Sequence, residues 1–89
     1  MFGEALMYSV LFVCTANICR SPMAMGIFKS KMQANEEWRI ESAGVWARQG
    51  YPVHTYVQMI LNNRGVDLKD HRSRRITREI LKHFNLVLV

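Results

Sequence analysis

Short apolar runs alternate with helix-period stretches along this chain, and this order of elements constrains the fold more than any other feature. Residues 8–13, 38–42 and 86–89 are short runs rich in β-branched or aromatic side chains, as buried strands are. Strands that alternate with helices form parallel sheets through right-handed crossovers. We therefore predict an α/β fold in three layers, with a parallel sheet covered by helices on both faces.

The first predicted helix follows a polar loop after the first strand. Ser21 and Pro22 should open it, with Ser21 as N-cap and Pro22 at the first helical position. The helix should end near Gln33 or Asn35. Its core-facing side is expected to hold four residues: Ala24, Ile27, Phe28 and the stem of Lys31.

Two further helices are predicted before the last strand. Gly65 should end the first of them as a C-terminal cap, and Thr77 should cap the second, with Glu79 in its first turn. The longer of the two has a stripe of five apolar residues at core-facing spacing: Val53, Tyr56, Val57, Ile60 and Leu61.

Composition indicates one small globular domain over residues 1–89. The hydrophobic fraction of 49% and the charged fraction of 21% are ordinary for such a domain. The apolar run at 10–14 is too short to cross a bilayer, and residues 1–9 lack the Lys or Arg of a secretory leader, so we expect no membrane partner. Cys14 and Cys19 are the only cysteines, and no spacing resembles a metal site. We expect a reducing, cytoplasmic setting, with neither metal nor cofactor.

The formal net charge of +5 suits an anionic partner without choosing one. Five cations near the C-terminus carry much of the excess: Arg72, Arg74, Arg75, Arg78 and Lys82. No aromatic residue interleaves with them, as base stacking would require. We interpret them as a solvated helix face and loop that can steer phosphate-bearing substrates, and we expect no nucleic-acid partner.

The loop between the first strand and the first helix has the composition of an anion site. Backbone N–H groups between a strand and a helix can form an anion-binding nest, which the helix dipole reinforces. Arg20 can close the nest with a bidentate fork on two phosphate oxygens. The same positive field should lower the pKa of Cys14 and favour its thiolate, the form that attacks phosphorus. The alternative is a buried Cys14 at a strand end and an Arg20 on an ordinary surface.

The residues around this loop resemble the signature of the low-molecular-weight protein tyrosine phosphatases. The resemblance begins with residues 10–24 (VLFVCTANICRSPMA) and continues through IESAG, RGVDL, HRSRRIT and FNLVL at 40–44, 64–68, 71–77 and 84–88. It thus covers nearly the whole chain in the family's order. It implies the phosphatase I-like, Rossmann-like topology of that family, whose members have four strands where this chain supplies three.

The resemblance also implies roles for individual residues. Cys14 would be the nucleophile, Arg20 would bind phosphate and stabilise the transition state, and Ser21 would assist departure of the Cys14 sulfur. Backbone groups of the loop would bind the phosphate, from Thr15, Ala16, Asn17, Ile18 and Cys19 to Arg20. Asn17, Ser42 and His71 match the network that supports the loop. By residue type alone, these three remain a turn residue, a strand-end serine and a surface histidine.

Three other residues have implied roles. Cys19 matches a family position that forms a reversible disulfide with the nucleophile, and its alternative is a small buried hydrophobic residue. Trp46 lies in a loop that borders the active-site mouth in the family, where it would stack on an aryl phosphate. Tyr51 is a weaker candidate for that contact, and either aromatic residue could instead cover core.

The resemblance stops short of the family's general acid. Family members carry an Asp-Pro loop and further elements after the third strand, and this sequence has no Asp-Pro. Asp67 and Asp70 are its only aspartates, and their positions favour turn or cap roles. We therefore expect a truncated domain that hydrolyses phosphotyrosine or aryl phosphates with impaired catalysis. Phosphate, sulfate and vanadate should inhibit it.

Two alternatives to this enzyme stay open. One is a non-catalytic module, a pseudoenzyme that binds phosphate or a partner. The other is an arsenate reductase, which shares the fold and the loop but needs downstream cysteines that do not follow Cys19 here. An open apolar edge at residues 86–89 also predicts a homodimer through this strand, or aggregation.

Overall fold

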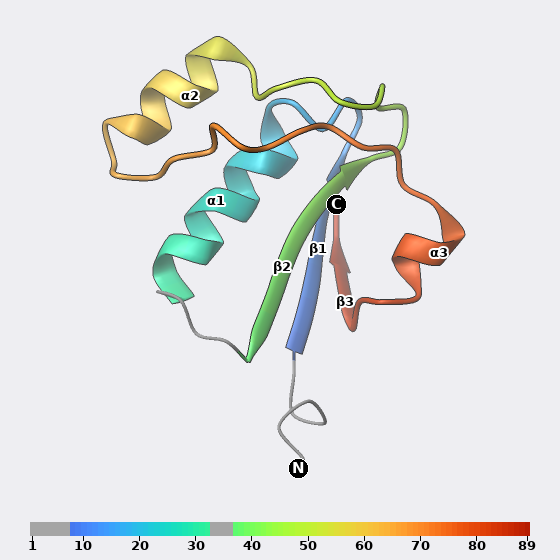
Figure 1. The fold of residues 1–89 in the computed structure, drawn as a ribbon. Helices are drawn as coiled ribbons and strands as arrows, with labels where there is room; N and C mark the ends of the chain where they lie inside the picture. The colour runs from blue at the N-terminus through green and yellow to red at the C-terminus, as the bar shows by residue number, and fades with distance from the viewer. Residues whose placement is uncertain (1–7, 33–36) are drawn as a thin grey trace.

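The computed structural model describes residues 8–32 and 37–89, and within these ranges it shows parallel strands with helices on both faces (Figure 1). The strands lie in the order β2-β1-β3, so β1 is central. The predicted α/β architecture is confirmed. In chain order the elements are β1 (Tyr8–Cys14), α1 (Arg20–Met32), β2 (Trp38–Gly44), α2 (Thr55–Asn62), α3 (Arg78–Leu81) and β3 (Leu86–Leu88). The predicted end of the first helix, at Gln33 or Asn35, lies outside the described residues, as does most of the 1–9 segment.

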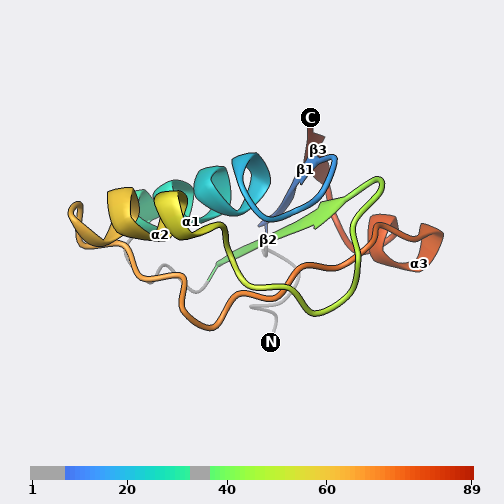
Figure 2. The same ribbon diagram turned by 90° about the horizontal axis from the view of Figure 1, so that it is seen from above.

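The central strand β1 is apolar on both faces because both faces are covered. Val10 belongs to the cluster beneath α1 and α2, whereas Leu11 and Val13 belong to a second cluster on the opposite face. Side chains alternate across a strand, so an uninterrupted apolar run is what a strand covered on both faces requires. The second cluster also contains Ala43, with three partly buried side chains packed against it: Ile76, Ile80 and Phe84. Seen from above, α1 and α2 lie on one side of the sheet and α3 on the other (Figure 2).

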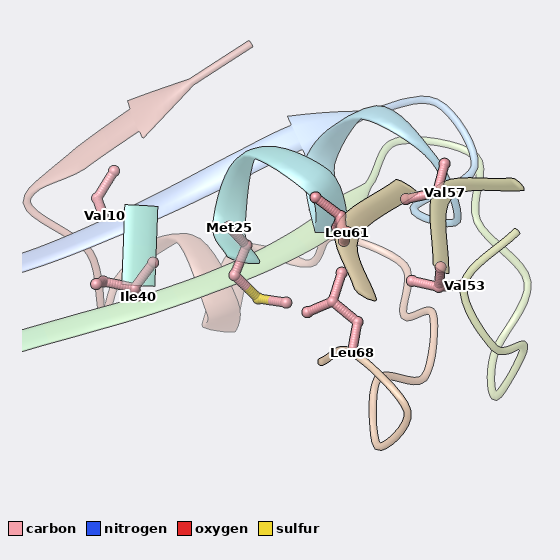
Figure 3. Packing of buried hydrophobic residues seen from close by; sticks show 7 residues of the cluster. All are labelled: Val10, Met25, Ile40, Val53, Val57, Leu61 and Leu68. Atoms are coloured by element: carbon pink, nitrogen blue, oxygen red, sulfur yellow. The ribbon is translucent and has the colours of Figure 1, made fainter. Parts of the chain in front are cut away.

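The larger core cluster joins β1, β2, α1 and α2. Figure 3 shows its seven buried side chains: Val10, Met25, Ile40, Val53, Val57, Leu61 and Leu68. The predicted stripe on the second helix is correct for Val53, Val57 and Leu61, which are all buried. It is wrong for Tyr56 and Ile60, whose exposed fractions are 70% and 51%. Because α2 lies at the margin of the sheet beside α1, only a narrow side of this helix reaches the core.

The buried side of α1 also differs from the prediction. Met25 and Gly26 are buried, whereas Ile27 and Phe28 are only partly buried and pack against the edge of the cluster. Ala24 is likewise half-buried, and Lys31 is exposed. A Cβ atom at Gly26 would lie 3.0 Å from a methyl group of Val66, so this side of α1 approaches the loop after α2 closely. The side of α1 that contains Met25 and Gly26 therefore faces the core, and not the side predicted from the sequence.

The ends of α2 and α3 follow their sequence signals. Gly65 has a φ of 77° and donates its N–H to Asn62, while the N–H of Val66 donates to the carbonyl of Leu61. This pattern is a Schellman motif, which favours glycine at the left-handed position. Thr77 caps α3 as predicted, because its side chain accepts the N–H of Ile80.

Parallel register brings the carboxyl ends of the strands to one edge. Cys14 pairs with Gly44 at the end of the β1–β2 ladder, and Gly44 forms an isolated parallel bridge with Arg75. The loops after β1 and β2 and the segment before α3 therefore meet at the same edge, as Figure 1 shows. Ligands bind at this edge in open α/β sheets. No helix in the described parts of the chain is long and apolar enough to span a membrane.

Candidate active site

Cys14 is the last residue of β1, and its half-buried thiol faces the start of α1. The Ser21 hydroxyl oxygen lies 3.1 Å from the Cys14 sulfur, and the Ser21 N–H donates to the same sulfur at an N···S distance of 3.4 Å. The prediction of Ser21 as N-cap is wrong. The helix begins at Arg20, and the first helical bond runs from the Met23 N–H to the carbonyl of Cys19. Ser21 thus lies inside the first turn with its hydroxyl directed at the sulfur.

The surroundings of Cys14 favour its thiolate. Burial raises the pKa of this thiol, but several interactions together outweigh that effect and leave the pKa below its ordinary value. The hydrogen bond from the Ser21 hydroxyl is the largest of these, followed by the backbone N–H groups of Ser21 and Asn17 and the charge of Arg20. All of them are donors or cations directed at one sulfur, which is how proteins activate a cysteine nucleophile.

Asn17 holds the loop in shape from its centre. Its exposed fraction is 0% and its φ is 59°, a left-handed conformation that asparagine tolerates better than most residues. The side-chain Nδ2 donates to the hydroxyl oxygens of Ser21 at 2.8 Å and Ser42 at 2.9 Å. Its Oδ1 accepts the backbone N–H of Arg74 at 2.9 Å. Because Ser21 accepts from Asn17, its hydroxyl proton is available to donate, either to the Cys14 sulfur at 3.1 Å or to the Ala43 carbonyl at 3.4 Å.

His71 supports the same residue from the other side. Its Nε2 donates to the backbone carbonyl of Asn17 at 2.9 Å. Burial lowers the pKa of His71, and the nearby charges of Arg72, Lys29 and Arg74 lower it further, against the opposing effect of the Asn17 carbonyl. The lowered pKa favours the neutral imidazole, and donation to a carbonyl requires its proton on Nε2. The structure thus brings together all three residues predicted to support the loop.

The backbone N–H groups of the loop differ from its carbonyls in their hydrogen bonds. Within the described residues, no N–H from Thr15 to Cys19 donates to another backbone carbonyl. Four carbonyls instead accept bonds from surrounding elements: Cys14 from Val45, Thr15 from Trp46, Asn17 from His71 and Ile18 from His54. A loop with this arrangement leaves successive N–H groups for an anion, as the predicted nest requires.

Gly44 is the point where β2 comes closest to the loop. A Cβ atom at this position would lie 2.5 Å from the carbonyl oxygen of Thr15 and 3.0 Å from the backbone nitrogen of Asn17. Both neighbours are backbone atoms, so no side-chain rotation relieves the clash. Glycine is required here because the loop packs directly against the end of β2.

Arg74 and Glu41 belong to the site although sequence reasoning missed them. Arg74 donates through Nε to the carbonyl of Ser42 at 2.9 Å and through a terminal nitrogen to Glu41 at 2.6 Å. Burial raises the pKa of Glu41, but hydrogen bonds from Arg39 and Arg74 lower it to a net value below the ordinary one. The prediction that Arg74 lies on a solvated face is wrong, because this pair fixes the backbone that binds Asn17. The only sequence signal was the position of Arg74 within the matched HRSRRIT segment.

Ser73 is a second residue that the sequence did not single out. It is 2% exposed, and its hydroxyl donates to the carbonyl of Arg48 at 2.5 Å. The Tyr51 N–H donates to the same hydroxyl oxygen at 2.9 Å, and the Gly50 N–H donates to the Ser73 carbonyl at 2.8 Å. Ser73 therefore joins the loop after β2 to the segment before α3.

The remaining predicted residues lie at the rim. Arg20 is exposed, and its guanidinium lies 3.4 Å from the Thr15 hydroxyl. Cys19 is exposed, so the reading of it as a buried hydrophobic residue is wrong, and its pairing with Cys14 stays a prediction. Trp46 is 74% exposed beside the loop, and Tyr51 is 48% exposed. Neither aromatic ring is buried as core cover.

Two small hollows flank Cys14. One, of about 390 Å³, lies between β1, α1 and the end of β3, and the other, of about 240 Å³, lies toward Val45. Neither lining contains an Asp or Glu side chain among the described residues. A larger hollow, of about 790 Å³, lies between α2 and residues 65–69, where none of the predicted site residues is found. The hydrogen bonds that converge on the Cys14 sulfur mark this edge of the sheet as the candidate site. No group of three or more potential metal ligands occurs among the described residues.

A half-buried cysteine with a lowered pKa, a loop whose N–H groups lack backbone acceptors and a following arginine define a class of cysteine-based sites on a parallel α/β sheet. Residues 9–89 match the family model of the low molecular weight phosphotyrosine protein phosphatases, and the chain belongs to this family. The family assignment made from the sequence is confirmed.

Individual relatives agree with this assignment. The crystal structure of a low molecular weight protein tyrosine phosphatase from T. tengcongensis is 46% identical, with a TM-score of 0.85 over 91% of this chain and 56% of that one. A protein-arginine-phosphatase from Geobacillus stearothermophilus is 39% identical over 81% of this chain and 47% of its own. Vibrio vulnificus Wzb in complex with benzylphosphonate is 25% identical, with a TM-score of 0.85 over 93% of this chain and 57% of that one. The chain spans about half the length of the curated relatives that it matches.

Proposed function

We propose that this chain binds phosphate monoesters at the loop after β1 and hydrolyses aryl phosphates, phosphotyrosine among them, through a cysteinyl-phosphate intermediate. The observation that carries the proposal is the convergence of the Ser21 hydroxyl and N–H on the Cys14 sulfur, at 3.1 and 3.4 Å. A structural cysteine has no need of two donors and a lowered pKa.

The first chemical step would use Cys14 and Arg20. The thiolate attacks phosphorus, a sulfur–phosphorus bond forms, and the aryl oxygen leaves with the electrons of its bond to phosphorus. The loop N–H groups bind the phosphoryl oxygens during the attack. Arg20, at present beside the Thr15 hydroxyl, is exposed and can close over two of these oxygens with its planar fork.

The second step would use Ser21. Water attacks phosphorus, and the sulfur leaves as a thiolate, which the hydroxyl of Ser21 stabilises by donating its proton as a hydrogen bond. Asn17 keeps that hydroxyl in position because it donates to the Ser21 oxygen. Cys14 must remain a free thiol throughout, so we place the protein in a reducing compartment such as the cytoplasm.

The aryl group of the substrate would meet Trp46. Its backbone N–H donates to the Thr15 carbonyl at 2.9 Å, which holds the exposed ring next to the loop. A stacked pair of aromatic rings contributes about 0.5–1.5 kcal/mol beyond the area it buries. The benzylphosphonate complex of Vibrio vulnificus Wzb supports an aromatic phosphate mimic as ligand. Phosphate, sulfate and vanadate should compete for the same N–H groups.

Protonation of the leaving group distinguishes an impaired enzyme from one that has a general acid. The hollows beside Cys14 contain no Asp or Glu side chain among the described residues, so none of these residues supplies a side-chain carboxylic acid to a departing oxygen. A tyrosine phenolate, with a pKa of about 10, leaves poorly without that proton. General-acid assistance is typically worth about 10²–10⁴-fold in rate.

Hydrolysis of two substrates by the same chain tests the proposed function. We expect weak turnover of p-nitrophenyl phosphate, whose leaving group needs no proton, and a far larger deficit on phosphotyrosine peptides, each measured against a full-length relative. Cys14→Ser should abolish both activities. Equal deficits on the two substrates would locate the defect in the loop instead of the leaving-group step.

A binding module without turnover is the second candidate. The described lining of the site contains no Asp or Glu side chain, and the anion nest needs no acid in order to bind phosphate. Phosphate binding with no Cys14-dependent hydrolysis of either substrate would establish this candidate.

We also propose that β3 pairs with a second copy of the chain. It is an edge strand of the described sheet, and Leu86, Val87 and Leu88 are all exposed at 38–51%. An exposed apolar edge is a template for pairing with another strand.

A further inference from the structure

Arg75 lies at the same edge of the sheet as Cys14, two strand positions away. Gly44 pairs with Cys14 in the β1–β2 ladder, and Arg75 forms a parallel bridge with Gly44. Adjacent strands are about 4.8 Å apart, so the backbone of Arg75 lies roughly 10 Å from that of Cys14. An arginine side chain at this distance can reach a group that neighbours a phosphate bound in the loop.

The guanidinium of Arg75 is held over Trp46. Its central carbon lies 5.8 Å from the centre of the Trp46 ring, within the range of a cation–π contact. Trp46 is itself fixed beside the loop by its backbone bond to Thr15, and the Arg75 N–H donates to the Gln49 side chain at 2.8 Å. Backbone hydrogen bonds therefore hold the two residues beside the loop, while the Trp46 side chain is open to solvent.

Arg75 combines a defined side-chain contact with the lack of a carboxylate partner among the described residues. Among the described residues, four cations lie within salt-bridge distance of a carboxylate: Arg39, Lys69, Arg74 and Lys82. Arg75 is not one of them, although its side chain has a defined contact. A positioned cation without a counter-ion at the mouth of an anion site is suited to a second negative group on the same ligand.

We propose that Arg75, supported by Trp46, is a specificity-determining residue that binds the carboxylate of an Asp or Glu next to the phosphorylated residue of a peptide substrate. The inference rests on the proposed function, because it concerns the substrate of the same site. Successive residues of an extended peptide are about 3.3 Å apart, so a carboxylate one or two residues from the phosphorylated side chain spans the distance to Arg75. Solvent-exposed charge pairs are weak, and we expect a preference of about two- to fivefold.

Peptide binding to the full chain tests this inference. The Cys14→Ser variant prevents turnover, and calorimetry then compares two phosphotyrosine peptides that differ only in having Glu or Ala on both sides of the phosphorylated residue. Arg75→Gln in this background should weaken binding of the Glu peptide about two- to fivefold and leave the Ala peptide and inorganic phosphate unchanged. Arg64→Gln, which removes the same charge from the turn after α2, should change none of the three. Arg75→Glu should reverse the preference toward a peptide with flanking Lys.

Each result decides a separate question. Equal losses for the Glu and Ala peptides, or no loss for either, would overturn the role of Arg75 while phosphate binding upheld the loop as an anion site. A Glu preference that Arg64→Gln weakens as much as Arg75→Gln would reduce the effect to net charge and would also overturn it. Failure to bind inorganic phosphate at all would overturn the proposed function together with this inference.

Discussion

The two neighbours of β1 differ sharply in how they are held. On one side, β2 pairs with β1 over its full length, from Trp38 to Gly44, and its carboxyl end is buried. On the other side, β3 pairs over three residues, all of them exposed. The loop that contains Cys14 takes its hydrogen bonds from the β2 side, from His54 before α2 and from the segment before α3. The geometry of the candidate site therefore depends on β1, β2 and residues 71–76, and hardly on β3.

The side chains show the same contrast. Asn17 is fully buried and uses both Nδ2 protons and Oδ1 within the loop network. Asn85, which begins the turn into β3, binds only Ser9: its Oδ1 accepts the Ser9 N–H at 3.1 Å, and its own N–H donates to the Ser9 hydroxyl at 2.8 Å. Asn17 therefore holds the loop of the candidate site in shape, whereas Asn85 connects the start of β3 to β1.

Matched alanine substitutions at these two asparagines should give the largest difference. Asn17→Ala leaves the buried Arg74 N–H unpaired and places alanine at a positive φ, so we expect a loss of about 2–4 kcal/mol in the free energy of unfolding. Phosphate affinity should fall with it. Asn85→Ala should cost about 1 kcal/mol and leave phosphate affinity unchanged. Urea unfolding and phosphate titration measure both quantities, and a larger loss of phosphate affinity in Asn85→Ala would reverse the comparison.

A smaller effect is expected from charging the edge strand. Leu86→Lys introduces a cation on an exposed edge, a device that natural sheets use against strand pairing. We expect light scattering to show a shift from dimer to monomer, with phosphate binding unchanged and stability altered by less than about 0.5 kcal/mol. Tyr56→Lys, an equally drastic change at an exposed position on α2, should leave assembly unaffected. If the unsubstituted chain is monomeric at high concentration, the proposed pairing of β3 with a second copy is wrong.

The sequence predicted the positions of the helices and strands better than it predicted which side of each helix is buried. Strand positions followed from the apolar runs, and Gly65 and Thr77 marked helix ends because those signals act within a few residues. Tyr56 and Ile60 were wrongly placed in the core, since helical spacing shows which residues share a side but not how far a neighbouring layer extends. That extent depends on the tertiary position of α2 beside α1.

In the site, too, the features that depend on residues close together in the sequence were the ones that could be predicted. Cys14, Arg20 and Ser21 lie close together in the chain, at the two ends of one loop, and could be read from their spacing and their family resemblance. Arg74 and Glu41 could not, because their roles come from strand register: the two residues are 33 positions apart, and their side chains are joined at 2.6 Å. Ser21 was misread as a helix cap because the residue type that caps helices is also the one that can donate to a thiolate.

The pH dependence of Cys14 alkylation tests the central claim that this loop is a prepared anion site with an activated thiol. The Cys19→Ser background removes the other thiol, and the rate of reaction with iodoacetamide is followed across pH. We predict a midpoint below the ordinary thiol value of about 8.5, a higher midpoint in Ser21→Ala, and slower alkylation when phosphate is added. A midpoint at or above about 8.5 that neither Ser21→Ala nor phosphate alters would contradict the account.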